Sequence, residues 1–269
     1  MSTVVFFHAH PDDEATLTAG TMARLASDHR VVLVVATRGE HGEFPAGLLA
    51  PGQTLRGRRT AETRWSAEIL GVARVEFLDY LDSGMAGTAT NEADGAFCRA
   101  DLDEAAHRLK AILDEERADL LTIYDDHGGY GHPDHVMVHR VGTRAAALSG
   151  GVALYEATIN RDHVRRGVEA LAASDAGSAA LVPDFGDDFG ESEASITHAV
   201  DVSDLCAVKR RAMSAHSSQI AETSFFLALP ERAFRAGFGY EWYIKRCGAP
   251  DGRPTCLDLI SRSPASLGR

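Results

Sequence analysis

The sequence has few of the features that mark secreted, membrane-spanning or disulfide-rich proteins. It contains only four cysteines in 269 residues, and no Cys-x-x-Cys pair. This spacing argues against a disulfide framework and against a thiolate zinc site. No stretch approaches the roughly 20 apolar residues that a membrane-spanning helix needs, and no basic segment precedes the short apolar run near the N-terminus, as it would in a signal peptide. We therefore expect a cytoplasmic protein that does not bind membranes.

Positive charge is also scarce. Lysine and arginine total 27 residues, against 39 aspartates and glutamates, which gives a formal net charge of −12. An acidic surface repels both the phosphate backbone of nucleic acids and anionic lipids. We therefore expect a small-molecule partner rather than nucleic acid, and the sequence leaves open whether the protein is a homo-oligomer.

Apolar runs alternate with helical patterns over the first 160 residues. The apolar runs predict strands at Val4–Phe7, Val31–Ala36, Val75–Leu78, Leu120–Tyr124 and Val152–Ala157. The helical patterns lie at Glu14–Ser27, Arg59–Leu70, Leu102–Glu116 and Val136–Leu148. This alternation predicts an α/β fold: a Rossmann-like, doubly wound, mainly parallel sheet with helices on both faces.

The C-terminal part is less regular. Ala199–Val202 predicts a further strand, Asp204–His216 a helix, and Phe234–Ile244 is an aromatic stretch without a clear period. Residues 42–54 are rich in Gly and Pro and predict a loop. Residues 174–195 are small, acidic and rich in Gly, which favours a mobile insertion. We expect a single domain over residues 1–269.

Two clusters of His and Asp follow predicted strands. His10, Asp12 and Asp13 come directly after the first strand, and His132–His135 follows the fourth strand after a short loop. Ligands of open parallel sheets bind beyond the carboxyl ends of the strands. We therefore expect both clusters to lie at one edge of the sheet, together with Asp82-Ser83-Gly84 after the third strand.

These residue types suit a hydrolytic metal site. A catalytic zinc ion takes three nitrogen or oxygen ligands from the protein and keeps a position for water. His10 and Asp13, three residues apart, can converge on a metal, and His135 can supply the third ligand. Asp12 then stands beside the metal water and can act as general base. Zinc is the expected metal, with ferrous iron as the alternative.

The second cluster offers supporting roles. His132, if protonated, can stabilise the oxyanion of a tetrahedral intermediate, and Asp134 can orient His132 or a metal ligand. Purely structural alternatives exist for the first cluster, because Asp12 or Asp13 can cap the following helix. His8 shares a strand face with His10, and we expect it to be a packing residue.

Two segments of the sequence resemble those of a known family. Ala9-His10-Pro11-Asp12-Asp13-Glu14 and Gly131-His132-Pro133-Asp134-His135 resemble the two signatures of the PIG-L/LmbE-like zinc N-deacetylases. Weaker similarity continues through most of the chain in the family's order. It lies at Ala36–Glu40, Arg59-x-x-Glu62, Asp82–Met85 and Lys209–Gln219.

The resemblance implies a hydrolase that removes an acyl group, usually acetyl, from the amide nitrogen of an amino sugar or sugar conjugate. It implies that His10, Asp13 and His135 bind zinc, that Asp12 is the general acid/base, that His132 stabilises the oxyanion, that Arg59 and Asp82 contact substrate, and that Tyr130 polarises the amide carbonyl. Arg59 as a solvated helix residue, Asp82 as a turn former and Tyr130 as a surface residue remain alternatives.

Two branches of this family serve mycothiol metabolism in actinobacteria. One deacetylates an N-acetylglucosaminyl-inositol precursor, and the other is an amidase that cleaves mycothiol conjugates. This chain carries Ala15-Thr16-Leu17 where those branches have more polar residues, which leaves an N-deacylase of secondary metabolism open. A metal- or sugar-binding protein without catalysis is a more distant alternative. A dinucleotide-binding protein is another, but no Gly-x-Gly-x-x-Gly loop follows the first strand.

Overall fold

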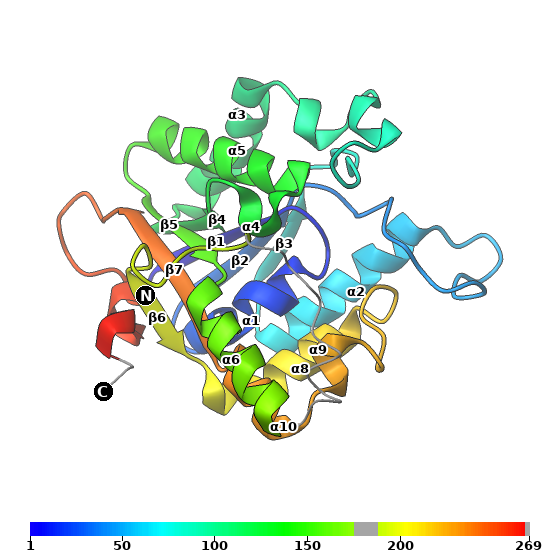
Figure 1. Ribbon diagram of the computed structural model, residues 1–269. Helices are drawn as coiled ribbons and strands as arrows, with labels where there is room; N and C mark the ends of the chain where they lie inside the picture. Colours follow the sequence, from blue (N-terminus) through cyan, green and yellow to red (C-terminus); the bar gives the residue numbers. More distant parts are fainter. Residues whose placement is uncertain (175–187, 267–269) are drawn as a thin grey trace.

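The computed structural model describes residues 1–174 and 188–266, so most of the predicted insertion at 174–195 lies outside the described residues. Within the described residues, eight strands form one sheet in the order β3-β2-β1-β4-β5-β7-β6-β8 (Figure 1). The strands are β1 Thr3–His8, β2 Arg30–Val35, β3 Arg74–Phe77, β4 Leu120–Tyr124, β5 Ala153–Thr158, β6 His198–Asp201, β7 Tyr240–Cys247 and β8 Ser261–Arg262.

The first five strands are parallel, as predicted. Val4 of β1 pairs with Val31 of β2 on one side and with Leu120 of β4 on the other. β7 then joins β5 in the antiparallel sense, and β6 and β8 continue the sheet. The prediction for Phe234–Ile244 was incomplete, because this stretch contains the end of a helix and the start of β7. The sheet is thus mixed but mainly parallel, and the predicted α/β class is confirmed.

Helices cover both faces of the sheet (Figure 1). Among the described residues, the helices of five residues or more are α1 Ala19–Ala26, α2 Leu55–Leu70, α3 Leu102–Glu116, α5 Pro133–Ser149, α6 Arg161–Ser174, α8 Cys206–Ala215, α10 Glu231–Phe238 and α11 Cys256–Ile260. α3 and α5 pack on one face, and α1, α2 and α8 on the other. No helix among the described residues is both long and apolar enough to cross a membrane.

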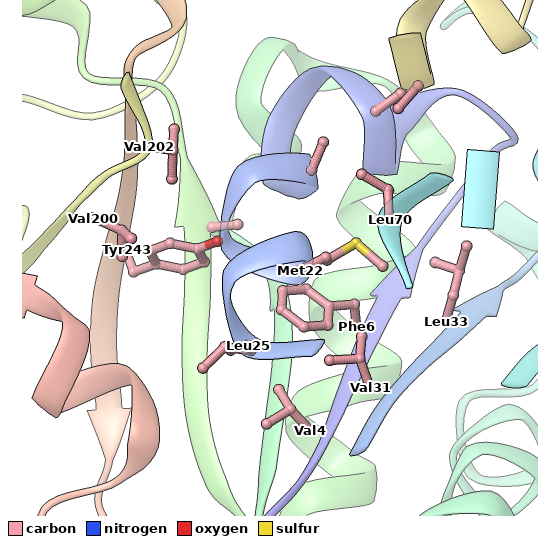
Figure 2. Close-up of a cluster of buried hydrophobic side chains, with 14 of the residues drawn as sticks. Val4, Phe6, Met22, Leu25, Val31, Leu33, Leu70, Val200, Val202 and Tyr243 are labelled. Carbon is pink, nitrogen blue, oxygen red and sulfur yellow. The ribbon is translucent and has the colours of Figure 1, made fainter. Parts of the chain in front are cut away.

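The strands contribute side chains to two hydrophobic cores because successive side chains point to opposite faces of the sheet. Val4 and Phe6 of β1 lie in the core with α1, α2 and α8, whereas Val5 and Phe7 lie in the core with α3 and α5. All four are fully buried, and burial of each such side chain stabilises the fold by about 1.5–3 kcal/mol. Figure 2 shows the first of these cores, where Met22 packs near Phe6. The sheet that carries the site is therefore clamped on both sides.

Several predicted helices begin at other residues in the structure. The helix predicted at Arg59–Leu70 begins at Leu55, and the one predicted at Asp204–His216 begins at Cys206. The helix predicted at Glu14–Ser27 is a π-helical turn, η1, at Glu14–Thr18 followed by α1. Such turns are uncommon, and they occur frequently at functional sites. The helix predicted at Val136–Leu148 begins earlier, at Pro133, with His132 as its N-cap. His135 is therefore in the first turn of α5 and not in the preceding loop.

Candidate active site

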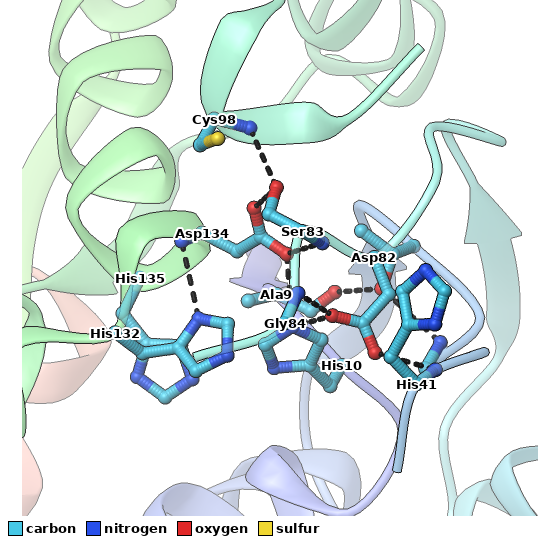
Figure 3. A network of polar contacts seen from close by, with 12 residues as sticks. Ala9, His10, His41, Asp82, Ser83, Gly84, Cys98, His132, Asp134 and His135 are labelled. Carbon is cyan, nitrogen blue, oxygen red and sulfur yellow. Dashed lines mark hydrogen bonds and ion pairs between the residues drawn. The ribbon is translucent and has the colours of Figure 1, made fainter. Parts of the chain in front are cut away.

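The two His/Asp clusters meet at the carboxyl edge of the sheet, as predicted (Figure 3). His10 follows β1, Asp82 follows β3, and His132 and His135 stand at the start of α5 after β4. The rings of His10, His132 and His135 have centroids 4.6–5.3 Å apart. All three side chains are buried. Segments more than 100 residues apart in sequence thus form one buried cluster.

His10 is oriented by carboxylates. Its Nε2 donates to Asp134 Oδ2 at 3.1 Å and lies 3.5 Å from Asp82 Oδ1. This leaves Nδ1 facing Asp13 Oδ2 at 3.5 Å. Burial alone would lower the pKa of His10, but the hydrogen bonds of Asp13, Asp134 and Asp82 raise that pKa well above its usual value. The contact through Nε2 fixes the ring so that Nδ1 is the nitrogen available to a metal.

His135 is arranged in the same way. Its Nδ1 donates to the carbonyl oxygen of Gly128 at 3.2 Å. Its Nε2 is buried without a hydrogen-bond partner among the described residues, and it lies 3.5 Å from Asp13 Oδ2. Gly128 has a φ of +68°, and a Cβ there would lie 2.5 Å from His135 Cβ. Only glycine therefore allows the loop to pass this close to His135.

Asp13 faces both His10 and His135 and so joins them in one group of three side chains. Its Oδ2 accepts hydrogen bonds from the backbone N of His10 and from the Tyr124 hydroxyl, each at 2.8 Å. Burial raises the pKa of Asp13, but His135 and His10 outweigh it and hold that pKa well below its usual range. Asp13 does not cap the following helix with its side chain. The capping alternative is therefore wrong for Asp13.

The two contacts of Asp13 match the spacing of zinc ligands, although no group of three or more described residues whose ligand atoms all lie within 4.8 Å of one another includes Asp13. Tetrahedral zinc with bonds of about 2.0 Å has ligand atoms roughly 3.3 Å apart, and Asp13 Oδ2 lies 3.5 Å from one nitrogen of each histidine. The Nε2 of His135 has no hydrogen-bond partner among the described residues, so it is the ligand atom that a metal would contact. His10, His132 and His135 form a second set, with ligand atoms within 4.8 Å of one another.

Asp12 stands at the edge of the cluster in a strained conformation. Its φ is +96°, which is rare for a residue other than glycine and costs about 1–3 kcal/mol. Its backbone N donates to Glu14 Oε2 at 3.0 Å, and its Oδ2 lies 3.4 Å from Arg59 Nη2. Burial, opposed in part by Arg59, raises the pKa of Asp12 to about 6. A carboxylate with a pKa near neutrality is suited to proton transfer.

Arg59 and Asp82, the two predicted substrate contacts, are both buried. Arg59 is 3% exposed, so it is not a solvated helix residue. Its Nη1 donates to Gly39 O at 2.8 Å and its Nη2 to Pro11 O at 2.6 Å. Asp82 Oδ1 accepts from the backbone N of Gly84 at 2.8 Å, as in a turn, while also facing His10. Contact of either residue with substrate stays a prediction.

His132 differs from the expectation in its charge. Its Nδ1 accepts from the backbone N of Asp134 at 3.2 Å. Burial, together with His10 and His135, lowers the pKa of His132 to about 4, so the ring is neutral at pH 7 rather than protonated. With Nδ1 accepting, a neutral ring carries its hydrogen on Nε2 and can still donate from there.

Asp134 orients a cluster histidine. Its carboxylate contacts His10 Nε2, and it also accepts from the backbone N of Ser83 at 2.9 Å and from the Ser83 hydroxyl. Of the two roles considered for its carboxylate, orientation of the neighbouring ligand His10 is the one that the contacts favour over orientation of His132.

Tyr130 stands in a loop of glycines at the mouth of the cluster. It belongs to the short turn α4, Gly128–Gly131, and its side chain is 48% exposed. Its ring centroid lies 5.0 Å from that of His135 and 6.3 Å from that of His132. The ring is therefore near the cluster and accessible from solvent.

Some positioning residues escaped sequence reasoning. The hydroxyl of Tyr124 donates to Asp13 and contacts His8 Nδ1 at 2.9 Å, so His8 is a buried packing residue as expected. Glu14 Oε1 contacts His216 Nε2 at 2.6 Å and Ser66 Oγ at 2.6 Å. The only signal for these contacts was polar residues beside apolar runs, since the partners lie far apart in the sequence.

The fold and this cluster together define an α/β protein with buried His and Asp side chains of the types that bind metals, beside the Asp12 carboxylate. Comparison with known proteins identifies the family. The family model PIG-L, described as GlcNAc-PI de-N-acetylase, matches residues 5–146. The chain is 39% identical to the 1D-myo-inositol 2-acetamido-2-deoxy-alpha-D-glucopyranoside deacetylase of Acidothermus cellulolyticus, over 94% of this chain and 93% of that protein.

The chain therefore belongs to the PIG-L family, and it is an amide-hydrolysing deacetylase of that family. Solved structures support the fold. The N,N'-diacetylchitobiose deacetylase from Pyrococcus horikoshii matches with a TM-score of 0.61 and 20% identity, over 96% of this chain and 89% of that chain. A 4-carboxy-2-hydroxymuconate hydratase, GalB, matches with a TM-score of 0.59 and 15% identity, over 95% of this chain and 100% of that chain. A shared fold alone does not determine the reaction.

Proposed function

We propose that this protein is a zinc-dependent N-deacetylase of an N-acetylated amino sugar, with the metal held by His10, Asp13 and His135. The carrying observation is that one nitrogen of each histidine faces Asp13 Oδ2, at 3.5 Å each. Bound zinc supplies a Lewis acid that activates water and polarises the amide carbonyl. Ferrous iron, which accepts the same donors, is the alternative metal.

The chain's own residues supply proton transfer and charge stabilisation. Asp12, with a pKa of about 6, takes a proton from the attacking water and returns it to the leaving amine nitrogen. His132 Nε2 donates to the carbonyl oxygen as it becomes an oxyanion, and the Tyr130 hydroxyl stands at the same mouth. Arg59 holds the strained Asp12 segment through Pro11 O.

The substrate class follows from the relatives and from the polar residues beside the cluster. The Acidothermus relative is named for an inositol glycoside of N-acetylglucosamine. Asp82, His41 and Glu40 lie together after β2 and β3, where Asp82 accepts from His41 N and Glu40 accepts from Asp82 N. Such groups are suited to a hydroxyl-rich sugar. We propose an N-acetylglucosaminyl-inositol or a similar amino-sugar conjugate as substrate.

The test combines metal content with amine release. We expect purified protein to hold about one zinc per chain and to release a primary amine from N-acetylglucosaminyl-inositol. His135→Ala should lose both properties. His139→Ala is the matched control, because His139 lies one helical turn further along α5 and bonds Tyr124 O instead of facing Asp13. Full zinc content in His135→Ala would refute the assigned ligand set.

A further inference from the structure

A large cavity lies next to the His/Asp cluster. It has a volume of about 640 Å³, and most of its lining residues come from α6, α10, β7 and the short helix α9, Phe225–Ala228. Pockets that bind small molecules typically enclose about 300–1,000 Å³. A second, smaller cavity of about 70 Å³ reaches Asp13 and His135 themselves. The larger cavity has no role in the proton transfers described above.

The two cavities share a wall. Thr16, Leu17, Tyr130, Thr158 and Ile159 line both of them. Tyr130 also contacts the rings of His132 and His135. The two cavities are therefore adjacent, with these five residues between them. Leu17 lies at this junction.

The walls of the larger cavity are apolar. Phe225, Phe226 and Phe238 form a ring cluster with centroids 5.4–6.0 Å apart. The buried charges at the wall are already paired, since Lys209 Nζ donates to Glu241 Oε1 at 2.6 Å. The Glu241 carboxylate also accepts from two backbone amides at the start of α1. The cavity therefore favours an apolar ligand over a charged one.

Two exposed glycines line the cavity. Gly167 lies in the middle of α6 and Gly237 in the last turn of α10, and a Cβ at either position would meet no heavy atom within 4 Å. Glycine inside a helix is about 1 kcal/mol less favourable than alanine, so helix stability does not explain Gly167. The buried Asn160 also lines the cavity, and its Nδ2 has no acceptor among the described residues. That amide is a donor available to a ligand oxygen.

The site thus has a polar side at the ends of β2 and β3 and an apolar side at the end of β5. An N-acyl amino sugar would place its sugar among Asp82, His41 and Glu40 and direct its acyl group toward Leu17 and Ile159. We infer that the larger cavity binds the acyl chain of the substrate, so that the protein accepts N-acyl groups longer and more apolar than acetyl. This inference rests on the proposed amide-hydrolysing function for the orientation of the substrate.

Binding can be measured separately from turnover. Zinc-loaded Asp12→Asn protein, which keeps the cavity but lacks the base, is titrated by calorimetry with N-acetylglucosamine, N-octanoylglucosamine and octyl N-acetylglucosaminide. Gly167→Phe is designed to fill the cavity, and Gly151→Phe is the matched control, because Gly151 is exposed like Gly167 but lies before β5 and does not line the cavity. Circular dichroism verifies that each variant is folded. A second filling variant, Gly237→Phe, is used if Gly167→Phe is not folded.

We expect N-octanoylglucosamine to bind at least about tenfold more tightly than N-acetylglucosamine, since each buried methylene contributes about 0.8 kcal/mol. The gain should disappear in Gly167→Phe and persist in Gly151→Phe. Equal binding of the two compounds, or a gain only for the octyl glycoside, would overturn the inference. Wild-type hydrolysis is measured in parallel. Hydrolysis of the acetyl compound without any chain-length gain refutes the acyl cavity alone, whereas a chain-length gain in binding without any hydrolysis supports the cavity and refutes the proposed function.

Discussion

The His/Asp cluster has a polar side and an apolar side, and the two sides differ in the partners of their polar atoms. On the side of β2 and β3, Asp82 and Arg59 are tied to backbone atoms and to neighbours of the cluster. On the side of β5, the wall presents phenylalanine rings and one self-contained ion pair, Lys209–Glu241. We therefore expect changes on the polar side to alter the reaction and metal binding. Changes on the apolar side should alter stability and substrate choice.

The largest effect is expected on the polar side, at Asp12. Asp12→Asn keeps the shape of the side chain but removes the base, so kcat should fall by about 100- to 10,000-fold. Zinc content should stay unchanged, because Asp12 is not in the assigned ligand set. Steady-state amine release and metal analysis measure the two properties. The exposed Asp28→Asn serves as control, and full activity in Asp12→Asn would refute its assigned role.

On the apolar side, the largest effect should be on folding. Lys209→Met leaves the buried Glu241 carboxylate without its cation, and the free energy of unfolding should fall by about 3–5 kcal/mol. The double variant Lys209→Met/Glu241→Gln should recover part of this loss, because Gln removes the unpaired buried charge and its one oxygen can still accept from one of the two amides at the start of α1. Urea unfolding measures both. An unfolding free energy that Lys209→Met leaves unchanged would contradict the ion pair's structural importance.

A smaller effect is expected where a carboxylate acts through a metal ligand. Asp134→Asn weakens the contact that orients His10, and zinc affinity should fall by about 10- to 100-fold. Ser83→Ala removes only one of the hydrogen bonds to Asp134 and should cost less. Competition with a zinc chelator gives the affinities. If Asp134→Asn bound zinc as tightly as the wild type, the orienting role would have to be abandoned.

The smallest effect is a shift in pH dependence. Asp12 must be deprotonated to accept a proton, so kcat/KM should fall as the pH drops through a midpoint no higher than about 6, since bound zinc lowers the pKa of Asp12 further. Arg59 also lowers this pKa, so Arg59→Gln should move the midpoint upward. A pH series of kcat/KM for both proteins measures the shift. A downward shift would show that another group controls the profile.

The sequence predicted the parallel part of the sheet and the meeting of the two motifs because both depend on local patterns. Val4–Phe7 and Leu120–Tyr124 are short apolar runs of a parallel sheet, and each is followed by its His/Asp segment. The side chain of His10 could be placed at the sheet edge for that reason. Its hydrogen bonds to Asp134 depend on packing between segments far apart in sequence and could not be predicted.

Little of the apolar side of the cluster could be predicted from the sequence. β7 carries Glu241 and Lys245 among aromatic residues, so its pattern resembles neither a buried parallel strand nor an amphipathic helix. Its insertion between β5 and β6 depends on pairing across more than 80 residues. The neutral state of His132 likewise results from burial beside two other histidines. Leu17 and the aromatic stretch Phe234–Ile244 were sequence signals on this side, and only the structure placed them at a cavity.

The most direct test of the central claim is a zinc titration of metal-free protein, with primary amine release from N-acetylglucosaminyl-inositol as the signal. The account predicts that activity rises in proportion to added zinc and reaches its plateau at about one zinc per chain. Full activity before zinc is added, or none on the N-acyl compounds at saturating zinc and ferrous iron, would contradict a metal-dependent deacetylase site built on His10, Asp13 and His135.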